Sequence, residues 1–359
     1  MNIVVIGAGY AGTVAANRLH KKVPDARITV VNPRGDFIER VRLHEQIAGS
    51  GTAARPLTEM LTAGIALETA SVDKIGDGDV TLDNGRILTF DHAILAAGSI
   101  ADPLPGAIPV GVWEGAEQAR AALEALPANG IVTVIGGGPT GIEITAEIAE
   151  ARPDLRVRLV SDTVAPALSA GAQRHIRHTL ARLNVEIVAD QITEIDGTTL
   201  RLGSGTELDS DLTLWAIISA VPELAARSGL AVDADGRALV DANLRSRTDP
   251  RIFVVGDCAA VPGMRMACAT AAPQGAHAAD TLADMIKGRA LRPFSMGYGG
   301  VGLSLGRRDG LMQTTDRADN AGRLFLGGRI TAFAKERVNR YAAYASRTGN
   351  SVWLSGPAQ

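Results

Sequence analysis

The sequence is poor in cysteine: its 359 residues hold two, Cys258 and Cys268. They form no CxxC pair, so we expect neither a disulfide framework nor a redox-active dithiol. We interpret both as small buried side chains. The six histidines show no metal-ligand spacing, and we therefore expect no metal site.

Strong net charge and long apolar runs are absent as well. The formal net charge is −3, and no basic stretch is interleaved with aromatic residues, so we expect no nucleic-acid partner. No run reaches about 18 apolar residues, the length that suits a membrane span. The chain starts directly in a predicted strand, so we expect no signal peptide. These features favour a cytoplasmic protein, with peripheral attachment to the inner face of the membrane as an alternative.

Glycine and hydrophobic residues are plentiful, with 40 glycines and 46% hydrophobic residues, which favours an ordered globular protein, and the length of 359 residues favours two or three domains. The first glycine-rich turn lies in "NIVVIGAGYAG", where Gly7, Gly9 and Gly12 have the GxGxxG spacing after a predicted strand. In a dinucleotide-binding fold these glycines allow a tight turn, close approach of a pyrophosphate, and close packing of helix on strand. The position expected to hold an acid for the ribose hydroxyls is Asn32, twenty residues after Gly12.

A second opening of the same kind occurs at "IVTVIGGGPTG", residues 131–141. Its glycines are Gly136, Gly138 and Gly141. Ser161 falls twenty residues after the last of them, and Asp162 follows. An acid there favours the free 2′-hydroxyl of NADH over the 2′-phosphate of NADPH. Ser161 in the slot itself leaves this choice open, with NADH preferred.

Two later segments also have the pattern of ligand-binding turns. In "DPRIFVVGDCAAV", residues 249–261, Gly256 and Asp257 follow a buried strand, and the carboxylate suits a hydroxyl-bearing ligand such as a ribityl chain. A simple turn-forming Asp is the alternative. The predicted helix that follows, residues 269–286, offers first-turn amides and Gln274 to an electron-rich ring.

Taken in order, the segments "VVIGAGYAG", "AILAAGS", "VIGGGPTGIE", "LTLW", "IFVVGDCAAV", "APQGAHAAD" and "GLSLGRRDG" cover the chain nearly end to end. As a set they resemble the two-dinucleotide-binding-domain flavoproteins, most closely the type II NADH dehydrogenase and apoptosis-inducing-factor-like branch. The resemblance implies an α/β fold of two Rossmann-like domains, the second inserted in the first, with a small C-terminal α+β cap. The implied parts are an FAD-binding domain (1–110 and 246–292), an NAD(P)-binding domain (111–245) and a cap (293–359) that serves the acceptor or a dimer.

The resemblance also implies the site residues. Those expected to contact FAD are Gly7, Gly9, Gly12, Asn32, Ala97, Gly98, Gly256, Asp257, Pro273 and Gln274. Those expected to contact NADH or NADPH are Gly136, Gly138, Gly141, Glu143, Ser161 and Asp162. Glu143, near the nicotinamide, and Gln274, near the pyrimidine edge of the flavin, are the expected catalytic residues. An ordinary exposed helix position is the alternative for Glu143.

The stretch "FIERVRLHEQIAG", residues 37–49, follows the second strand of the FAD domain and is expected to pass near the flavin. Arg40, Arg42 and His44 are candidates for contact with the ring or an acceptor. Solvent-facing charges on a loop are the alternative.

One departure from the family bears on function. Where the family has glycine after "LTLWA", this chain has Ile217 and Ile218, whose stiff β-branched side chains narrow the expected nicotinamide pocket. We expect hydride transfer from NAD(P)H to FAD and electron transfer to a quinone or another small acceptor. Two alternatives stay open: a repurposed FAD enzyme acting on an organic metabolite through a weakened nicotinamide site, and a flavin-binding regulatory protein with slow turnover.

The C-terminal tail differs from the rest in charge. Residues 307–347 carry nine basic and four acidic residues. Apolar residues of this tail recur at helical spacing, namely Ile330, Phe333, Ala334, Val338, Tyr341, Tyr344 and Ala345. This predicts an amphipathic helix that lies on an anionic membrane, on its own domain, or on the partner subunit of a homodimer.

Overall fold

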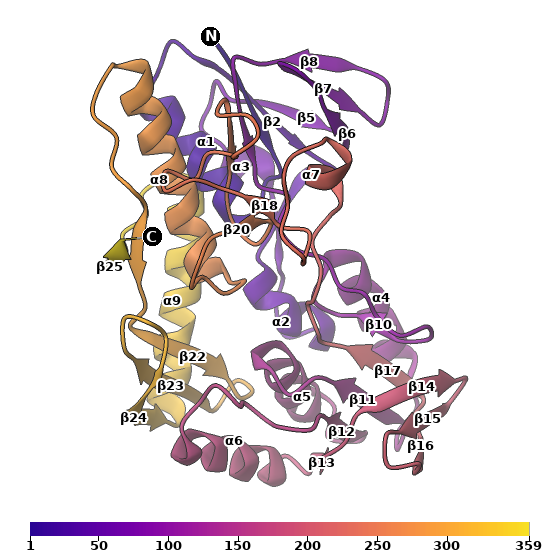
Figure 1. Cartoon of the computed structure of the whole chain (residues 1–359). Coiled ribbons are helices and arrows are strands. Elements are labelled where there is room, and N and C mark those ends of the chain that lie inside the picture. Colours follow the sequence, from indigo (N-terminus) through magenta and orange to yellow (C-terminus); the bar gives the residue numbers. More distant parts are fainter. Residues whose placement is uncertain (359) are drawn as a thin grey trace.

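The computed structural model describes residues 1–358, and two parallel sheets dominate it, one in each lobe (Figure 1). The first sheet has the order β19-β9-β1-β2-β5, with strands Ile252–Val254, His92–Leu95, Asn2–Ile6, Arg27–Asn32 and Ala66–Thr69. The second has the order β10-β17-β11-β12-β13, with strands Ile108–Pro109, Leu212–Trp215, Ile131–Ile135, Arg156–Val160 and Glu186–Val188. Central strands such as β1 and β11 read as continuous apolar runs because both faces of a parallel sheet are covered.

Each glycine-rich turn leads from the central strand of its sheet into a helix. The turn after β1 leads into α1 (Tyr10–Lys22), and the turn after β11 leads into α5 (Pro139–Ala151). The other helices of eight or more residues in the two lobes are α4 (Trp113–Ala125), α6 (Ala170–Arg182) and α8 (Cys268–Ile286). Helices α1 and α8 touch closely, since a Cβ on Gly275 would overlap the carbonyl of Ala11.

Each lobe also carries a three-stranded antiparallel sheet between corresponding elements of its fold. These sheets are β6-β7-β8 (Val72–Ile75, Asp79–Leu82, Ile87–Thr89) and β14-β15-β16 (Ile192–Asp196, Thr199–Leu202, Glu207–Asp209). The remaining short elements of the lobes are β3 (Asp36–Ile38), η1 (Arg40–Arg42), α2 (Leu43–Ala48), β4 (Ala54–Pro56), α3 (Leu57–Met60), α7 (Leu224–Arg227), β18 (Ala238–Leu239) and β20 (Ala259–Ala260). The repeated plan confirms the predicted pair of Rossmann-like units.

The C-terminal cap combines strands with one long helix. Its elements are β21 (Ser295–Gly297), β22 (Gly300–Ser304), β23 (Gly310–Thr315), β24 (Ala321–Gly327), α9 (Arg329–Thr348) and β25 (Leu354–Ala358). Helix α9 confirms the predicted tail helix. It runs beside α8 and continues to the sheet β22-β23-β24, which lies against the second lobe (Figure 1). The cap therefore touches both lobes.

The hydrophobic cores follow the sheets more closely than the predicted boundaries do. One core surrounds the first sheet and another surrounds the second. Val221, Leu230 and Leu244 belong to the core of the first sheet, although they precede residue 246. Ile108, before residue 111, packs on the core of the second. The exact domain limits remain a prediction.

Candidate functional site

The first glycine loop has the shape that a pyrophosphate requires. A Cβ on Gly7 would overlap the carbonyl of Ala96, and one on Gly12 would overlap the carbonyl of Gly7. A Cβ on Gly9, in contrast, would meet nothing within 4 Å among the described residues. Gly7 and Gly12 thus allow β1 and α1 to pack closely, and Gly9 faces open space at the positive end of α1.

Two polar side chains border this loop. The Tyr10 hydroxyl is buried and has no hydrogen-bond partner within residues 1–358. Asn32 is also buried: its Oδ1 accepts from the Ala8 N–H at 3.0 Å, and its Nδ2 donates to the Arg34 carbonyl at 2.7 Å. Asn32 therefore stabilises the loop. Its Oδ1 can accept a second hydrogen bond, and a contact of this atom with a ribose hydroxyl stays a prediction.

The second loop repeats the first. A Cβ on Gly141 would overlap the carbonyl of Gly136, whereas a Cβ on Gly138 would meet nothing within 4 Å in the described part of the chain. At the end of β12, the Ser161 hydroxyl donates to the Thr163 carbonyl at 2.9 Å. The exposed Asp162 carboxylate accepts from the side chain of Gln191. Both glycine loops thus offer a cradle that fits a dinucleotide.

A polar cluster joins four distant segments beside the first loop. Asp257 accepts a hydrogen bond from the Ser99 hydroxyl at 2.6 Å. Arg40 lies 3.9 Å from Asp257 and donates to the carbonyls of Ser99 (3.2 Å) and Gly111 (3.1 Å). Burial lowers the pKa of Arg40, and the charge of Asp257 opposes that effect. The predicted ribityl carboxylate therefore has an arginine and a serine beside it, at the strand end that includes Ala97 and Gly98.

Gln274 lies inside the fold rather than on an open surface. Its Oε1 accepts the Gly256 N–H at 2.7 Å, and its side chain is 2% exposed. It thereby fixes the turn that presents Asp257, next to the buried Pro273 of the same helix. A direct contact of Gln274 with the flavin stays a prediction. The contact that the structure shows is the hydrogen bond with Gly256, which positions the turn before Asp257.

Glu143 is buried, so the alternative of an ordinary exposed helix residue is wrong. Its Oε1 accepts the Ser304 N–H at 2.9 Å and lies 3.4 Å from the Lys335 ammonium. Because α5, β22 and α9 supply these three groups, the carboxylate sits where the second lobe meets the cap. The sequence alone did not single out Lys335 or Ser304, because both lie about 160 or more residues from Glu143.

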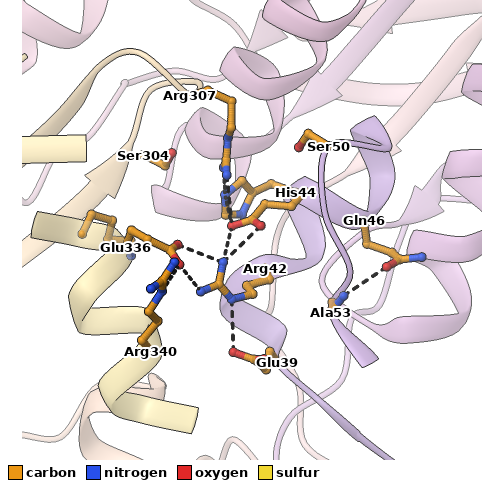
Figure 2. Close-up of polar contacts among 12 residues, drawn as sticks. Glu39, Arg42, His44, Gln46, Ser50, Ala53, Ser304, Arg307, Glu336 and Arg340 are labelled. Atoms are coloured by element: carbon orange, nitrogen blue, oxygen red, sulfur yellow. Dashed lines mark hydrogen bonds and ion pairs between the residues drawn. The ribbon is translucent and has the colours of Figure 1, made fainter. Parts of the chain in front are cut away.

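Arg42 and His44 occupy a buried ion network between α2 and α9 (Figure 2), so the alternative of solvent-facing charges is wrong for both. The Arg42 guanidinium contacts Glu39 at 3.2 Å, Glu45 at 2.9 Å and Glu336 at 2.9 Å. These ion pairs tie the loop after β3 to the cap. Contact of Arg42 with a ring or an acceptor stays a prediction.

His44 lies deeper in the same network. The Arg307 guanidinium donates to its Nε2 at 3.3 Å, and Glu45 lies 3.8 Å from the same nitrogen. Burial lowers the pKa of His44, and the carboxylates of Glu143, Glu147 and Glu45 oppose that effect. The imidazole is therefore neutral near neutral pH.

The two isoleucines after β17 have different environments. Ile217 is 36% exposed, and its Cγ1 lies 3.0 Å from where a Cβ of Gly136 would be. Ile218 is half-buried, and a Cβ on Gly111 would overlap its side chain. Ile217 therefore packs against Gly136, the first glycine of the second loop, and leaves the space at Gly138 open, whereas Ile218 packs against Gly111.

The remaining candidate chemistry is limited. Both cysteines are free. Cys258 is buried, as interpreted from the sequence, whereas Cys268 is only half-buried. Burial raises the pKa of Cys258 to about 11 and also raises that of Cys268. Within residues 1–358, no group of three or more His, Cys, Asp or Glu side chains is arranged to hold a metal ion. None of the helices described for residues 1–358 has the length and apolar character needed to cross a membrane.

Known proteins share both the sequence pattern and the fold. The pyridine nucleotide-disulphide oxidoreductase family model matches residues 1–279. Ferroptosis suppressor protein 1 of Xenopus laevis is 26% identical, over 94% of this chain and 93% of that protein. The type II NADH:quinone oxidoreductase of Staphylococcus aureus is 24% identical, over 95% of each. The structure of NDH2 from Plasmodium falciparum in complex with NADH superposes with a TM-score of 0.80 at 14% identity, covering 96% of this chain and 97% of that one.

Proposed function

The chain belongs to the pyridine nucleotide-disulphide oxidoreductase family, and we propose that it is an NADH:quinone oxidoreductase that works at a membrane surface. It is an NAD(P)H oxidoreductase that binds FAD and NAD(P)H. The observation that carries the finer proposal is the buried Glu143–Lys335 ion pair between the second lobe and the cap. It provides a titratable group on the same helix as the second glycine loop.

The chain's own residues would hold the two cofactors. The open loops at Gly9 and Gly138 would bind the pyrophosphates, and Asp257 with Arg40 and Ser99 would bind the ribityl side. The flavin, when bound, accepts the hydride and passes on the electrons. The protein's task is to position the rings and exclude water, so positioning residues matter more than a nucleophile and base.

The dinucleotide preference is proposed from charge. The Asp162 carboxylate lies just after β12, where the adenosine ribose is expected. Its negative charge would repel the 2′-phosphate of NADPH, whereas it can accept a hydrogen bond from the 2′-hydroxyl of NADH. Asp162 supports NADH as the electron donor.

A quinone is the proposed acceptor because its two-electron reduction also needs protons, which Glu143 and Lys335 can hold. The two cysteines are free thiols with raised pKa values, so they do not support an acceptor disulfide. The S. aureus relative is a type II NADH:quinone oxidoreductase by name, and it aligns with 95% of this chain.

The cap offers a surface for membrane contact, which we call the cap face. Large apolar side chains project from β24 and α9 there: Leu324 (74% exposed), Leu326 (73%), Ile330 (86%) and Phe333 (67%). Exposed basic residues occur in the same two elements, namely Arg323 in β24 and Arg329 and Arg337 in α9. Exposed apolar groups with arginines suit the interface of an anionic membrane, where a lipid quinone resides. A homodimer contact through the same face is the alternative.

The experiment that tests this function is steady-state turnover of the FAD-loaded protein with NADH and a short-chain quinone. We expect turnover, and Glu143→Gln should lower it roughly 100-fold, the range for loss of an acid–base group. Glu150→Gln, two turns further along α5, is the matched control and should retain activity. Equal turnover of the parent and Glu143→Gln would contradict the role of Glu143. Absence of quinone reduction by the parent would contradict the function.

The position of Ile217 favours one second candidate. Because the partly exposed Ile217 lies beside Gly136 where the family has glycine, a flavoenzyme that oxidises or reduces an organic metabolite with little use of NADH is the second candidate. Flavin reduction by NADH separates the two functions, since only the first requires it to be fast.

A further inference from the structure

A cavity of about 530 Å³ lies where the C-terminal ends of α5 and α6 meet the β22–β23 turn and the start of α9. Its volume falls in the range of about 300–1,000 Å³ that small-molecule sites occupy. Three guanidinium groups line it, from Arg182 at the end of α6, Arg308 in the turn and Arg329 at the start of α9. We call it the arginine cavity.

The arginine cavity is separate from both glycine loops. It lies at the C-terminal end of α5, whereas the second glycine loop precedes the N-terminal end of this helix. Helix α5 has 13 residues and rises about 1.5 Å per residue, so roughly 20 Å separates its two ends. The first glycine loop belongs to the other lobe. A ligand of the arginine cavity is therefore distinct from the two dinucleotides.

Two carboxylates also line the cavity, and the backbone of the cap holds both of them. Asp309 accepts hydrogen bonds from the N–H groups of Gly310 and Gly328, at 2.8 Å each. Glu150 accepts one from the Arg307 N–H at 2.5 Å. Burial alone would raise the pKa of Asp309, but its hydrogen bonds outweigh burial and lower the pKa. These contacts fix the turn and the start of α9 around the cavity.

The three arginines are less fully paired than the carboxylates. Arg182 donates to Asp309 at 2.8 Å, and Arg308 lies 3.4 Å from Glu150. Arg329 has no carboxylate partner within residues 1–358. A guanidinium has five N–H donors, so a single carboxylate leaves several of them unused. The cavity wall thus combines an excess of positive charge with spare hydrogen-bond donors.

We propose that the arginine cavity binds a phosphate group, either free or carried by a lipid headgroup. The planar fork of an arginine pairs with two oxygens of a phosphate at once, and here three forks come from three different elements. The start of α9 adds to this attraction, because its first turn holds no acidic residue and no side chain caps it. The inference goes beyond the proposed function, since it concerns a ligand other than the electron donor and acceptor.

A bound phosphate would join two parts of the molecule. Arg182 belongs to the second lobe, whereas Arg308 and Arg329 belong to the cap. A ligand held by both would stabilise their contact and raise the Tm. Arg329 also directly precedes Ile330, which is 86% exposed on the cap face. A headgroup can therefore reach the cavity from a membrane that contacts this face.

The test measures binding to the FAD-loaded protein with NAD⁺ present, so that both glycine loops are filled. Isothermal titration calorimetry with inorganic phosphate, and with a short-chain phosphatidylglycerol kept below its micelle concentration, distinguishes the two sources. Sodium chloride at equal ionic strength controls for screening. We expect saturable binding and a higher Tm with at least one probe. Binding of the lipid alone would assign the site to a headgroup, and binding of both would assign it to the phosphate itself.

Two variants locate the binding. Arg308→Met and Arg329→Met replace exposed side chains, so both should fold, and each should weaken binding roughly tenfold. Arg177→Met removes an exposed arginine of α6 that does not line the cavity, and this matched control should bind as the parent does. Absence of saturable binding to the parent would overturn the inference, and so would equal affinity in the parent and both cavity variants. Neither outcome depends on quinone reduction, so the proposed function is tested separately.

Discussion

At the scale of single residues, the site depends on side chains whose partners come from remote parts of the chain. Glu143 is buried where Ser304 and Lys335 meet it from the cap. Gln274 holds the Gly256 turn, so that Asp257 points toward Ser99 and Arg40. Such residues act by fixing geometry, and small substitutions among them should affect the reaction more than the fold.

Ile217 gives a prediction at this scale. Ile217→Gly should remove the side chain beside Gly136 and lower the KM for NADH roughly tenfold, equivalent to about 1.4 kcal/mol. Ile218→Gly, its neighbour, removes packing on Gly111 and should lower the Tm without lowering that KM. Steady-state kinetics with NADH, together with thermal unfolding, would check both variants. A KM unchanged by Ile217→Gly would show that the side chain leaves the nicotinamide path open.

At the scale of elements, the two glycine loops make separable predictions. Gly9→Ala should leave the apoprotein folded, because its Cβ meets open space, but should reduce bound FAD. Gly138→Ala should retain FAD and slow its reduction by NADH. Gly35→Ala, which also meets open space but lies outside both loops, is the control. Flavin content and thermal unfolding measure the outcome; loss of folding in Gly9→Ala would contradict the assignment.

The contact between α2 and α9 gives a second prediction for elements. Arg42→Met removes one cation from the buried carboxylates of Glu39 and Glu45, which keep Arg55 and Arg307 as partners. It should therefore lower the free energy of unfolding by about 1–3 kcal/mol. Arg337→Met, on the exposed side of α9, should change it little. Urea unfolding of the two variants checks the difference.

The pH dependence of this contact has a definite sign. Burial alone would raise the pKa of Glu336, but hydrogen bonds from Arg42 and Arg340 outweigh it and lower the pKa. The Arg42–Glu336 ion pair therefore adds to the free energy of unfolding at pH values above the ordinary carboxyl pKa. This stabilisation is lost as the pH falls through the lowered pKa of Glu336. The stability gap between the parent and Glu336→Gln should narrow in acid. A gap that stays constant would contradict this.

How much of these elements the sequence could predict depends on the range of the interaction. Gly7, Gly9 and Gly12 follow a local spacing rule, and so do Gly136, Gly138 and Gly141, so both openings were predictable. The tail helix followed from its apolar period. The burial of Arg42 was not predictable, because its partner Glu336 lies 294 residues away and only the tertiary fold joins them.

At the scale of the whole molecule, the cap touches both lobes and presents its apolar face outward. Because Leu326 and Phe333 are exposed beside arginines, Leu326→Glu and Phe333→Glu should each weaken co-sedimentation with vesicles containing anionic lipid. Ile87→Glu, an exposed position on β8 away from the cap, is the control. If both cap variants still co-sediment strongly with the vesicles, the membrane contact lies on another surface. If the substitutions instead convert a dimer to a monomer, the cap face is the contact with a second copy of the chain.

The order of the two lobes was predictable from sequence, whereas the extent of their packing was not. Residues such as Val221 and Leu244 return to the first core through short apolar segments without a clear period.

The central claim is that the two lobes bring a nicotinamide to a flavin. The most direct test is anaerobic rapid mixing of the FAD-loaded protein with NADH, following the flavin absorbance. We predict full bleaching faster than steady-state turnover, with Gly138→Ala much slower; an unbleached flavin in the parent would contradict the account.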